Sequence, residues 1–241
     1  MNIIKLNAIN STNDYLKSLA SAQYLENFTL VTAETQTQGK GQMGAVWNAQ
    51  AGKNLTFSIL LKDLLNDTAA IFTLNVAVAV AVASAVSGFG IADISIKWPN
   101  DILAGNKKIC GILIENSIKS DGQIHSIIGI GLNVNQTDFE GLPKASSMAV
   151  KAGKPFDKDE VMLAIAHQLQ QHVSDLESDA PALWQQYHNV LFKKDIPMPF
   201  EKEGRRFMGI IQKVTQNGQL EVLLEDDTLA HYNIKEVQLL Y

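Results

Sequence analysis

The chain has 241 residues, 46% of them hydrophobic and 19% charged, which is enough to bury a substantial core. Its formal net charge of -5 and pI near 5.5 disfavour sequence-independent binding to nucleic acid or anionic lipid, because both require a positive field. The single cysteine, Cys110, lies in the apolar run KKICGILIE, so we expect a reduced core residue in a soluble, cytoplasmic protein.

The first part of the chain alternates strand and helix patterns. Strands are predicted at 3–6, 28–34 and 54–61, and a helix at about 13–25. The start of the chain lacks a charged segment followed by an apolar one, so we expect no export signal. This alternation predicts a mixed sheet with helices packed on it.

The segment GKGQMG, residues 39–44, fits the dinucleotide spacing G-x-G-x-x-G. The residues after Gly44 have no helical period, however, and a dinucleotide site needs a helix there. The segment is also not a P-loop. We therefore predict a lid loop with one cation, Lys40, that orders over an anionic ligand, with a mobile surface loop as the alternative.

The apolar segment 69–86 has nearly the length of a membrane span. It contains Thr73, Asn75 and Ser84 and has no basic flank, so a buried core helix is the stronger interpretation.

The segment 93–133 reads as a series of strands. The runs DISIKW, DILAG, KKICGILIEN and QIHSIIGIGLNVN are rich in β-formers, with turns predicted at Gly105-Asn106 and at 120–122. After a loop, Asp157 and Glu160 predict the start of a helix that reaches to about residue 178, and a second helix is predicted at 182–191.

From about residue 195 only short strand patterns remain, and they predict a small SH3-like barrel. This part carries slightly more acidic than basic residues, which disfavours nucleic-acid binding. The fold class is therefore α+β, a mixed-sheet domain packed with helices (residues 1–191) followed by an SH3-like C-terminal domain (residues 192–241).

Five short motifs follow one another along the chain: Ser11-Thr12-Asn13, GKGQMGAVW, KWPND, KKICGILIE and GIGLNVN. In this order they resemble the biotin protein ligases over the whole chain, including the small C-terminal barrel. The resemblance implies the class II synthetase-like biotin/lipoate ligase fold. Met1 leads almost directly into the first predicted strand, so the resemblance is to the monofunctional type without an N-terminal DNA-binding domain, and we expect no role in DNA control.

The resemblance implies an ATP-dependent ligase with Mg²⁺ as cofactor. It would join biotin and ATP into biotinyl-5'-AMP, release pyrophosphate, and transfer biotin to a lysine of a biotin carboxyl carrier protein domain. A homodimer that pairs through the sheet edge is a further expectation. The alternatives are a lipoate or octanoate ligase or transferase of the same fold, and a non-catalytic binding module.

The resemblance assigns the catalytic roles to Lys108, Asp101 and Lys40. Lys108 would reach the biotin carboxylate and the adenylate phosphate, although strand alternation alone does not choose between Lys107 and Lys108. Asp101 would also help to deprotonate the acceptor lysine. Without the surrounding motifs, either lysine reads as a solvated turn residue and Asn100-Asp101 as turn chemistry.

The binding residues are carried over in the same way. Biotin would contact Ser11, Thr12, Asn13, Gln36, Gly39, Lys40, Gly41, Gln42, Lys108 and Gly111; ATP would contact Lys97, Trp98, Asn100, Asn133 and Trp47; Mg²⁺ would be held by Asp101 and Asn100. Other readings stay open: helix capping for Ser11 or Thr12, a surface position for Gln36, a strand-end turn for Asn133, and loop anchoring for Trp47. The five histidines lack ligand spacing, so no zinc site is assigned.

The glycine loop departs from the pattern of the family. The usual loop carries several arginines, whereas this chain has Lys40, Gln42 and Ala45 at those places. A lysine lacks the two-pronged donor geometry of arginine. We therefore expect this loop to hold the adenylate less firmly than an arginine-rich one.

Overall fold

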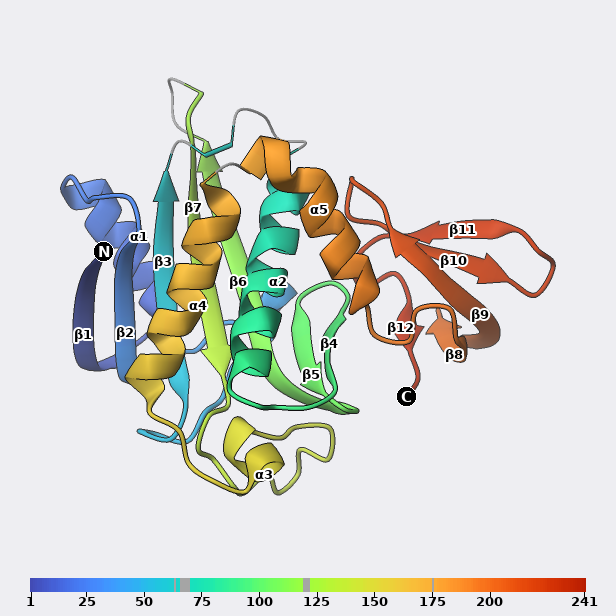
Figure 1. Ribbon diagram of the computed structural model, residues 1–241, viewed down its shortest axis with the longest axis horizontal. Helices are drawn as coiled ribbons and strands as arrows, with labels where there is room; N and C mark the ends of the chain where they lie inside the picture. The colour runs from blue at the N-terminus through green and yellow to red at the C-terminus, as the bar shows by residue number, and fades with distance from the viewer. Residues whose placement is uncertain (63, 66–69, 119–121, 175) are drawn as a thin grey trace.

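The computed structural model describes residues 1–62, 64–65, 70–118, 122–174 and 176–241. A seven-stranded sheet forms its centre, and a second, smaller sheet lies beside it (Figure 1). The order of the central strands is β1 (Asn2–Ile9), β2 (Thr29–Gln36), β3 (Leu55–Lys62), β7 (Ile124–Leu132), β6 (Lys107–Ile118), β5 (Asp101–Ala104) and β4 (Ile94–Lys97). Only β1 and β2 run parallel, so the sheet is mixed, as predicted.

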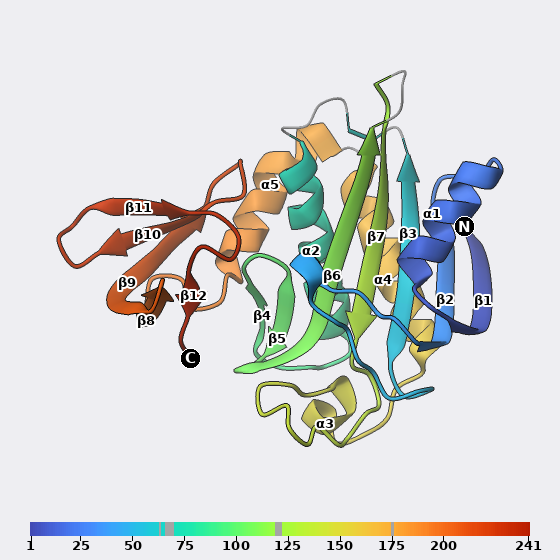
Figure 2. The same cartoon turned by 180° about the vertical axis from the view of Figure 1, so that it is seen from behind.

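Helices cover both faces of this sheet. Helix α1 (Thr12–Ala22) buries Leu16 against Val31, Leu60 and Ile127 on one face, which is nearest the viewer in Figure 2. The opposite face carries the main core together with α2 (Ile71–Gly88), α4 (Lys158–Val173) and α5 (Leu176–Asn189) (Figure 1).

Helix α2 explains the apolar segment. It is long and apolar enough to cross a membrane, yet 61% of the segment is buried inside the protein. Its alanines and valines pack against α4, α5 and β4, because small side chains let neighbouring helices approach closely. The predicted core helix is therefore present, although its predicted first residue, Ala69, lies outside the described residues.

The later helices differ from the predictions at their ends. The side chain of Asp157 accepts hydrogen bonds from the backbone N–H groups of Asp159 and Glu160, so the predicted start of α4 is confirmed. Helix α5 begins before Pro181 rather than after it, and its residues Leu176, Leu183 and Tyr187 are buried, so core packing offsets the cost of the proline. The short helix α3 (Met148–Ala152) was not predicted. The predicted turn residues Ser120 and Asp121 lie outside the described residues.

The smaller sheet has the order β11 (Leu229–Tyr232), β10 (Leu220–Leu224), β9 (Arg205–Val214), β8 (Pro197–Lys202) and β12 (Gln238–Leu239). A separate C-terminal β unit is thus present as predicted, but β11 and β12 do not pair within the described residues, so no closed barrel is formed there. A buried hydrogen bond of 2.9 Å from Trp98 Nε1 to Gly218 O joins it to the segment after β4.

Gly218 provides a test of how the smaller sheet packs against helix α2. It has a φ of +83°, and a Cβ there would lie 2.3 Å from Phe72 Cδ2, whereas Gly204 has a φ of +77° with no atom within 4 Å of its Cβ position. We expect Gly218→Ala to lower the free energy of unfolding by about 2–4 kcal/mol, and Gly204→Ala by about 1 kcal/mol from backbone strain alone. Urea unfolding of both variants measures this, and equal losses would contradict the packing described.

Candidate active site

A cavity of about 660 Å³ opens where the sheet, the start of α1, the glycine loop and the tail of the small sheet meet. In Figure 2 the blue segment after β2 crosses in front of β7 and β6. Most of the predicted site residues line this cavity: Ser11, Thr12, Asn13, Gln36, Lys40, Gly41, Gln42, Trp47, Lys97, Trp98, Asn100, Asp101, Lys108 and Gly111. Gly39 and Asn133 are not among the lining residues.

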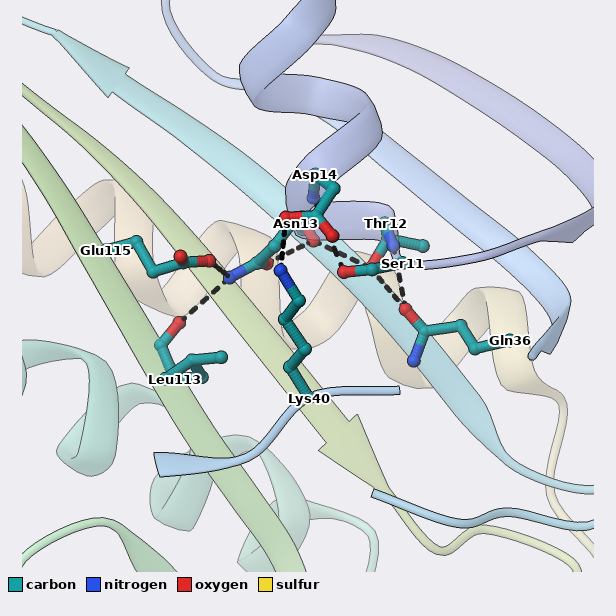
Figure 3. A network of polar contacts seen from close by, with 9 residues as sticks. Ser11, Thr12, Asn13, Asp14, Gln36, Lys40, Leu113 and Glu115 are labelled. Carbon is teal, nitrogen blue, oxygen red and sulfur yellow. Dashed lines mark hydrogen bonds and ion pairs between the residues drawn. The ribbon is translucent and has the colours of Figure 1, made fainter. Parts of the chain in front are cut away.

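The polar end of the cavity is a hydrogen-bonded network (Figure 3). Gln36 Oε1 accepts from Thr12 N at 2.7 Å and from Thr12 Oγ1 at 3.0 Å. Ser58 Oγ lies 2.7 Å from Thr12 Oγ1 and 2.6 Å from Asn13 Oδ1, and Asn13 Nδ2 donates to Glu115 Oε2 at 2.7 Å. The directions of the Thr12, Asn13 and Gln36 side chains are therefore fixed before any ligand arrives.

Two members of this network were not predicted. Ser58 is a fully buried residue in the middle of β3, and Glu115 lies on β6 after the glycine of KKICGILIE. An apolar strand pattern gives no sign that one hydroxyl will contact a helix start. Ser11 has the capping role that was left open, since its side chain accepts from Asp14 N at 3.3 Å.

Charged groups gather at the other end of the cavity. Asp101 Oδ1 lies 2.6 Å from Lys108 Nζ, and Asp101 Oδ2 lies 3.7 Å from Lys97 Nζ. Burial lowers the pKa of Lys97, and the Asp101 carboxylate opposes this shift. Of the two neighbouring lysines, Lys108 lines the cavity, whereas Lys107 is exposed, donates to Pro143 O and is not among the lining residues.

The pairing of β4, β5 and β6 creates this cluster. Lys97 faces Asp101 across the β4–β5 pair, and Asp101 faces Gly111 across the β5–β6 pair. An irregularity between Ile102 and Leu103 shifts the register that follows. Two motifs that are separate in the sequence, KWPND and KKICGILIE, thereby place their charged side chains together.

The glycine loop contains the short 3-10 turn η1 (Gln42–Gly44), which was not predicted. Lys40 pairs with Val46 in a β-bridge, and its Nζ lies 2.7 Å from Asp14 Oδ1. The hydrogen bond with Asp14 raises the pKa of Lys40. The ammonium group of Lys40 therefore lies at the start of α1 and not at the cluster around Asp101.

Trp47 holds the end of the loop against the sheet. Gly111 and Gly131 face each other on β6 and β7, and a Cβ on Gly131 would lie 2.4 Å from Trp47 Cε2. Only glycine lets the indole lie this close to the strands. The ring centroid of Trp47 is 5.7 Å from Lys108 Nζ, which allows a cation–π interaction.

Two further lysines, Lys144 and Lys235, line the cavity. Lys144 Nζ lies 4.3 Å from the centroid of the Tyr241 ring, and Lys97 Nζ lies 5.6 Å from the same centroid. Sequence reasoning missed these residues because they lie in segments without a recognisable motif. The lining therefore combines several ammonium groups with the carboxylate of Asp101, an arrangement suited to anionic ligands.

Asn133 and Gly39 support the site from outside the lining. Asn133 is buried, and its Nδ2 donates to Ser146 O at 3.0 Å, which fixes the segment that carries Lys144. A Cβ on Gly39 would lie 2.3 Å from Trp47 O, so this glycine lets the two ends of the loop meet.

Comparison with known proteins places this chain in a family. Residues 6–133 match the biotin/lipoate A/B protein ligase family. The chain belongs to this family. It is similar to the bifunctional ligase/repressor BirA of Bacillus spizizenii, at 34% identity over 195 residues, which covers 77% of this chain and 59% of BirA.

Two further similarities concern a relative and the fold. The biotin–[acetyl-CoA-carboxylase] ligase of Mycobacterium tuberculosis is 28% identical over 218 residues, covering 87% of this chain and 79% of that protein. The structure of the Aquifex aeolicus biotin protein ligase in complex with biotin and ATP superposes with a TM-score of 0.81 at 24% identity, covering 99% of this chain and 98% of that one. The predicted family is confirmed, and so is the α+β fold class with a mixed sheet and a separate C-terminal sheet, without the closed barrel.

The charge cluster predicts a change in the pKa of Lys97. In Asp101→Asn the carboxylate that favours the ammonium form is lost, while burial and Lys108 still disfavour it, so we expect the pKa of Lys97 to fall further below its usual value. NMR titration of the lysine ε-carbons measures this shift. Asp138→Asn, an exposed substitution outside the cavity lining, should leave Lys97 unchanged. An unchanged or higher pKa in Asp101→Asn would contradict the described electrostatics.

Proposed function

We propose that this chain is an ATP-dependent biotin ligase, which forms biotinyl-5'-AMP with release of pyrophosphate and then transfers biotin to a lysine of a biotin carboxyl carrier protein domain with release of AMP. The observation that carries the proposal is one cavity that joins a fixed polar network at its α1 end to the Lys97, Asp101 and Lys108 cluster at its other end. The names of the relatives, which include biotin–[acetyl-CoA-carboxylase] ligase, support biotin over lipoate.

The first step must bring together two anions, the carboxylate of biotin and the α-phosphate of ATP. Two unit charges 4 Å apart repel by about 4 kcal/mol at the effective dielectric of a protein surface. Lys108 would contact both groups, and its side chain is only partly exposed, so solvent screens it less than a surface lysine. Lys97 would add a second positive charge on the phosphate side.

The polar network provides the groups that a ureido ring requires. Biotin has a ring with hydrogen-bond donors and an acceptor, and a sulfur ring and alkyl chain that need apolar walls. Ser11, Thr12, Asn13 and Gln36 would serve the ureido group, and Phe57 and Ile112 line the same cavity as apolar walls. Trp47 would cover the nucleotide side.

The magnesium ion of Mg-ATP fits this donor set only together with the phosphates. Asp101 supplies one carboxylate, and Asn100 uses its amide nitrogen for Ile112 O at 2.7 Å, which leaves its oxygen as a ligand. Mg²⁺ is commonly held by one or two carboxylates with phosphates and water completing the shell. In the second step Asp101 would take a proton from the acceptor lysine.

The remaining features of the proposal concern the whole chain. Residues 1–191 would form the catalytic domain and residues 192–241 the SH3-like domain. The net charge of -5 supports a protein that does not bind DNA, and we propose a cytoplasmic location. Strand β1 ends the central sheet at one side, where a homodimer would pair.

The proposal predicts which lysine and which acid the reaction requires. We expect biotin to support ATP–pyrophosphate exchange and lipoate not to, and the purified protein to transfer labelled biotin to a carrier domain when ATP and Mg²⁺ are supplied. Lys108→Met should slow the exchange by about a hundredfold or more, since it removes a cation from the reacting groups. Lys107→Met, which changes an adjacent exposed lysine, is the matched control and should retain activity.

Each other outcome has a clear meaning. Exchange with lipoate alone would replace biotin by lipoate as substrate. Exchange with neither acid would favour a non-catalytic binding module. An active Lys108→Met variant with the circular dichroism spectrum of the wild type would remove Lys108 from the mechanism.

A further inference from the structure

The glycine loop, residues 39–47, has no free cation of its own. Its one basic side chain, Lys40, forms an ion pair with Asp14 at 2.7 Å. Other hydrogen bonds of the loop join its own backbone groups, such as Gly41 N to Ala45 O at 2.7 Å and Trp47 N to Gly39 O at 2.9 Å. These bonds shape the loop but do not hold its tip to the far side of the cavity.

A lysine of the small sheet makes that connection. Lys235 Nζ donates to Met43 O at 2.7 Å, between residues 192 positions apart. Lys235 lies between β11 and β12, and Met43 is in the turn η1 at the tip of the loop. Both residues have positive φ angles, +66° and +51°, which non-glycine residues adopt only when their surroundings require it.

The small sheet is itself fixed to the opposite side of the cavity. Trp98 Nε1 donates to Gly218 O in a buried bond, and the aromatic ring of Tyr241 lies near the ammonium groups of Lys97 and Lys144. Residues of its tail line the cavity: Ile234, Lys235, Val237, Gln238, Leu239 and Tyr241. The bond from Lys235 to Met43 therefore completes a ring of contacts around the cavity.

We propose that Lys235 is a positioning residue that latches the glycine loop closed over the acyl adenylate. The inference deepens the proposed function and rests on it. An acyl adenylate is destroyed by water, so a loop that closes over it protects the intermediate. Because Lys40 is paired with Asp14, the donor that holds the tip comes from the C-terminal sheet and not from the loop itself.

Limited trypsin digestion tests the latch without any need for catalysis. Lys235→Met keeps the apolar stem but removes the donor, so we expect cleavage of the Lys40–Gly41 bond to become roughly fivefold faster, as for loss of a charged hydrogen bond near the surface. Lys235→Arg, which retains a donor, should restore slow cleavage. Lys213→Met is the matched control, since Lys213 is on the same sheet but outside the cavity lining. Equal cleavage rates in Lys235→Met and the wild type would overturn the latch.

A second measurement connects the latch to the chemistry. In Lys235→Met we expect biotinyl-5'-AMP to dissociate several-fold faster than in the wild type in stopped-flow experiments, and in Lys235→Arg we expect slow dissociation to be restored. Unchanged dissociation in a variant that still forms the adenylate would overturn the proposal. If the wild type forms no adenylate, the proposed function fails, and the proteolysis result still decides whether Lys235 holds the loop.

Discussion

Asp101 holds two lysine ammonium groups in one partly buried cavity, and the arrangement of the site depends on this interaction. Without the carboxylate, Lys97 and Lys108 would repel each other in a place where water screens charge poorly. The three residues come from β4, β5 and β6, so the cluster exists only when these strands pair in the observed register. The central sheet thus positions the charges that the proposed reaction needs.

The other elements of the fold surround this cluster with polar and aromatic side chains. Helix α1 begins at the cavity and, through Ser58 and Glu115, has its polar side chains fixed in advance. Paired glycines on β6 and β7 let the indole of Trp47 lie on the sheet. The small sheet closes the opposite side through Trp98 and Lys235, so residues from both ends of the chain contribute to one site.

The features predicted correctly from the sequence are those that a local residue pattern or a motif encodes. The Ala/Val helix, the cap at Asp157 and the separate C-terminal strands follow from periodicity and side-chain chemistry, and the order of the motifs led to the family. Sequence reasoning could not choose Lys108 over Lys107, because that choice depends on which side of the β5–β6 pair faces the cavity.

Contacts between residues far apart in the sequence could not be predicted either, because they depend on how distant segments pack. Lys144, Lys235 and Ser58 have no local signature, and each acquires its role from a segment far away in sequence. The ion pair of Lys40 with Asp14 was also missed, since nothing in the glycine motif indicates which acid the lysine will meet. The placement of Pro181 within α5 shows that tertiary packing can override a local helix-breaking signal.

The central claim is that lysines from separate segments converge on two anions and offset their repulsion. A crystal structure of the protein with a non-hydrolysable biotinyl-adenylate analogue tests this most directly. The account predicts that the phosphate of the analogue lies within hydrogen-bond reach of Lys108 Nζ, with Lys97 on the same side and the ureido ring among Thr12, Asn13 and Gln36. A phosphate bound elsewhere, with Lys108 still paired only to Asp101, would contradict it.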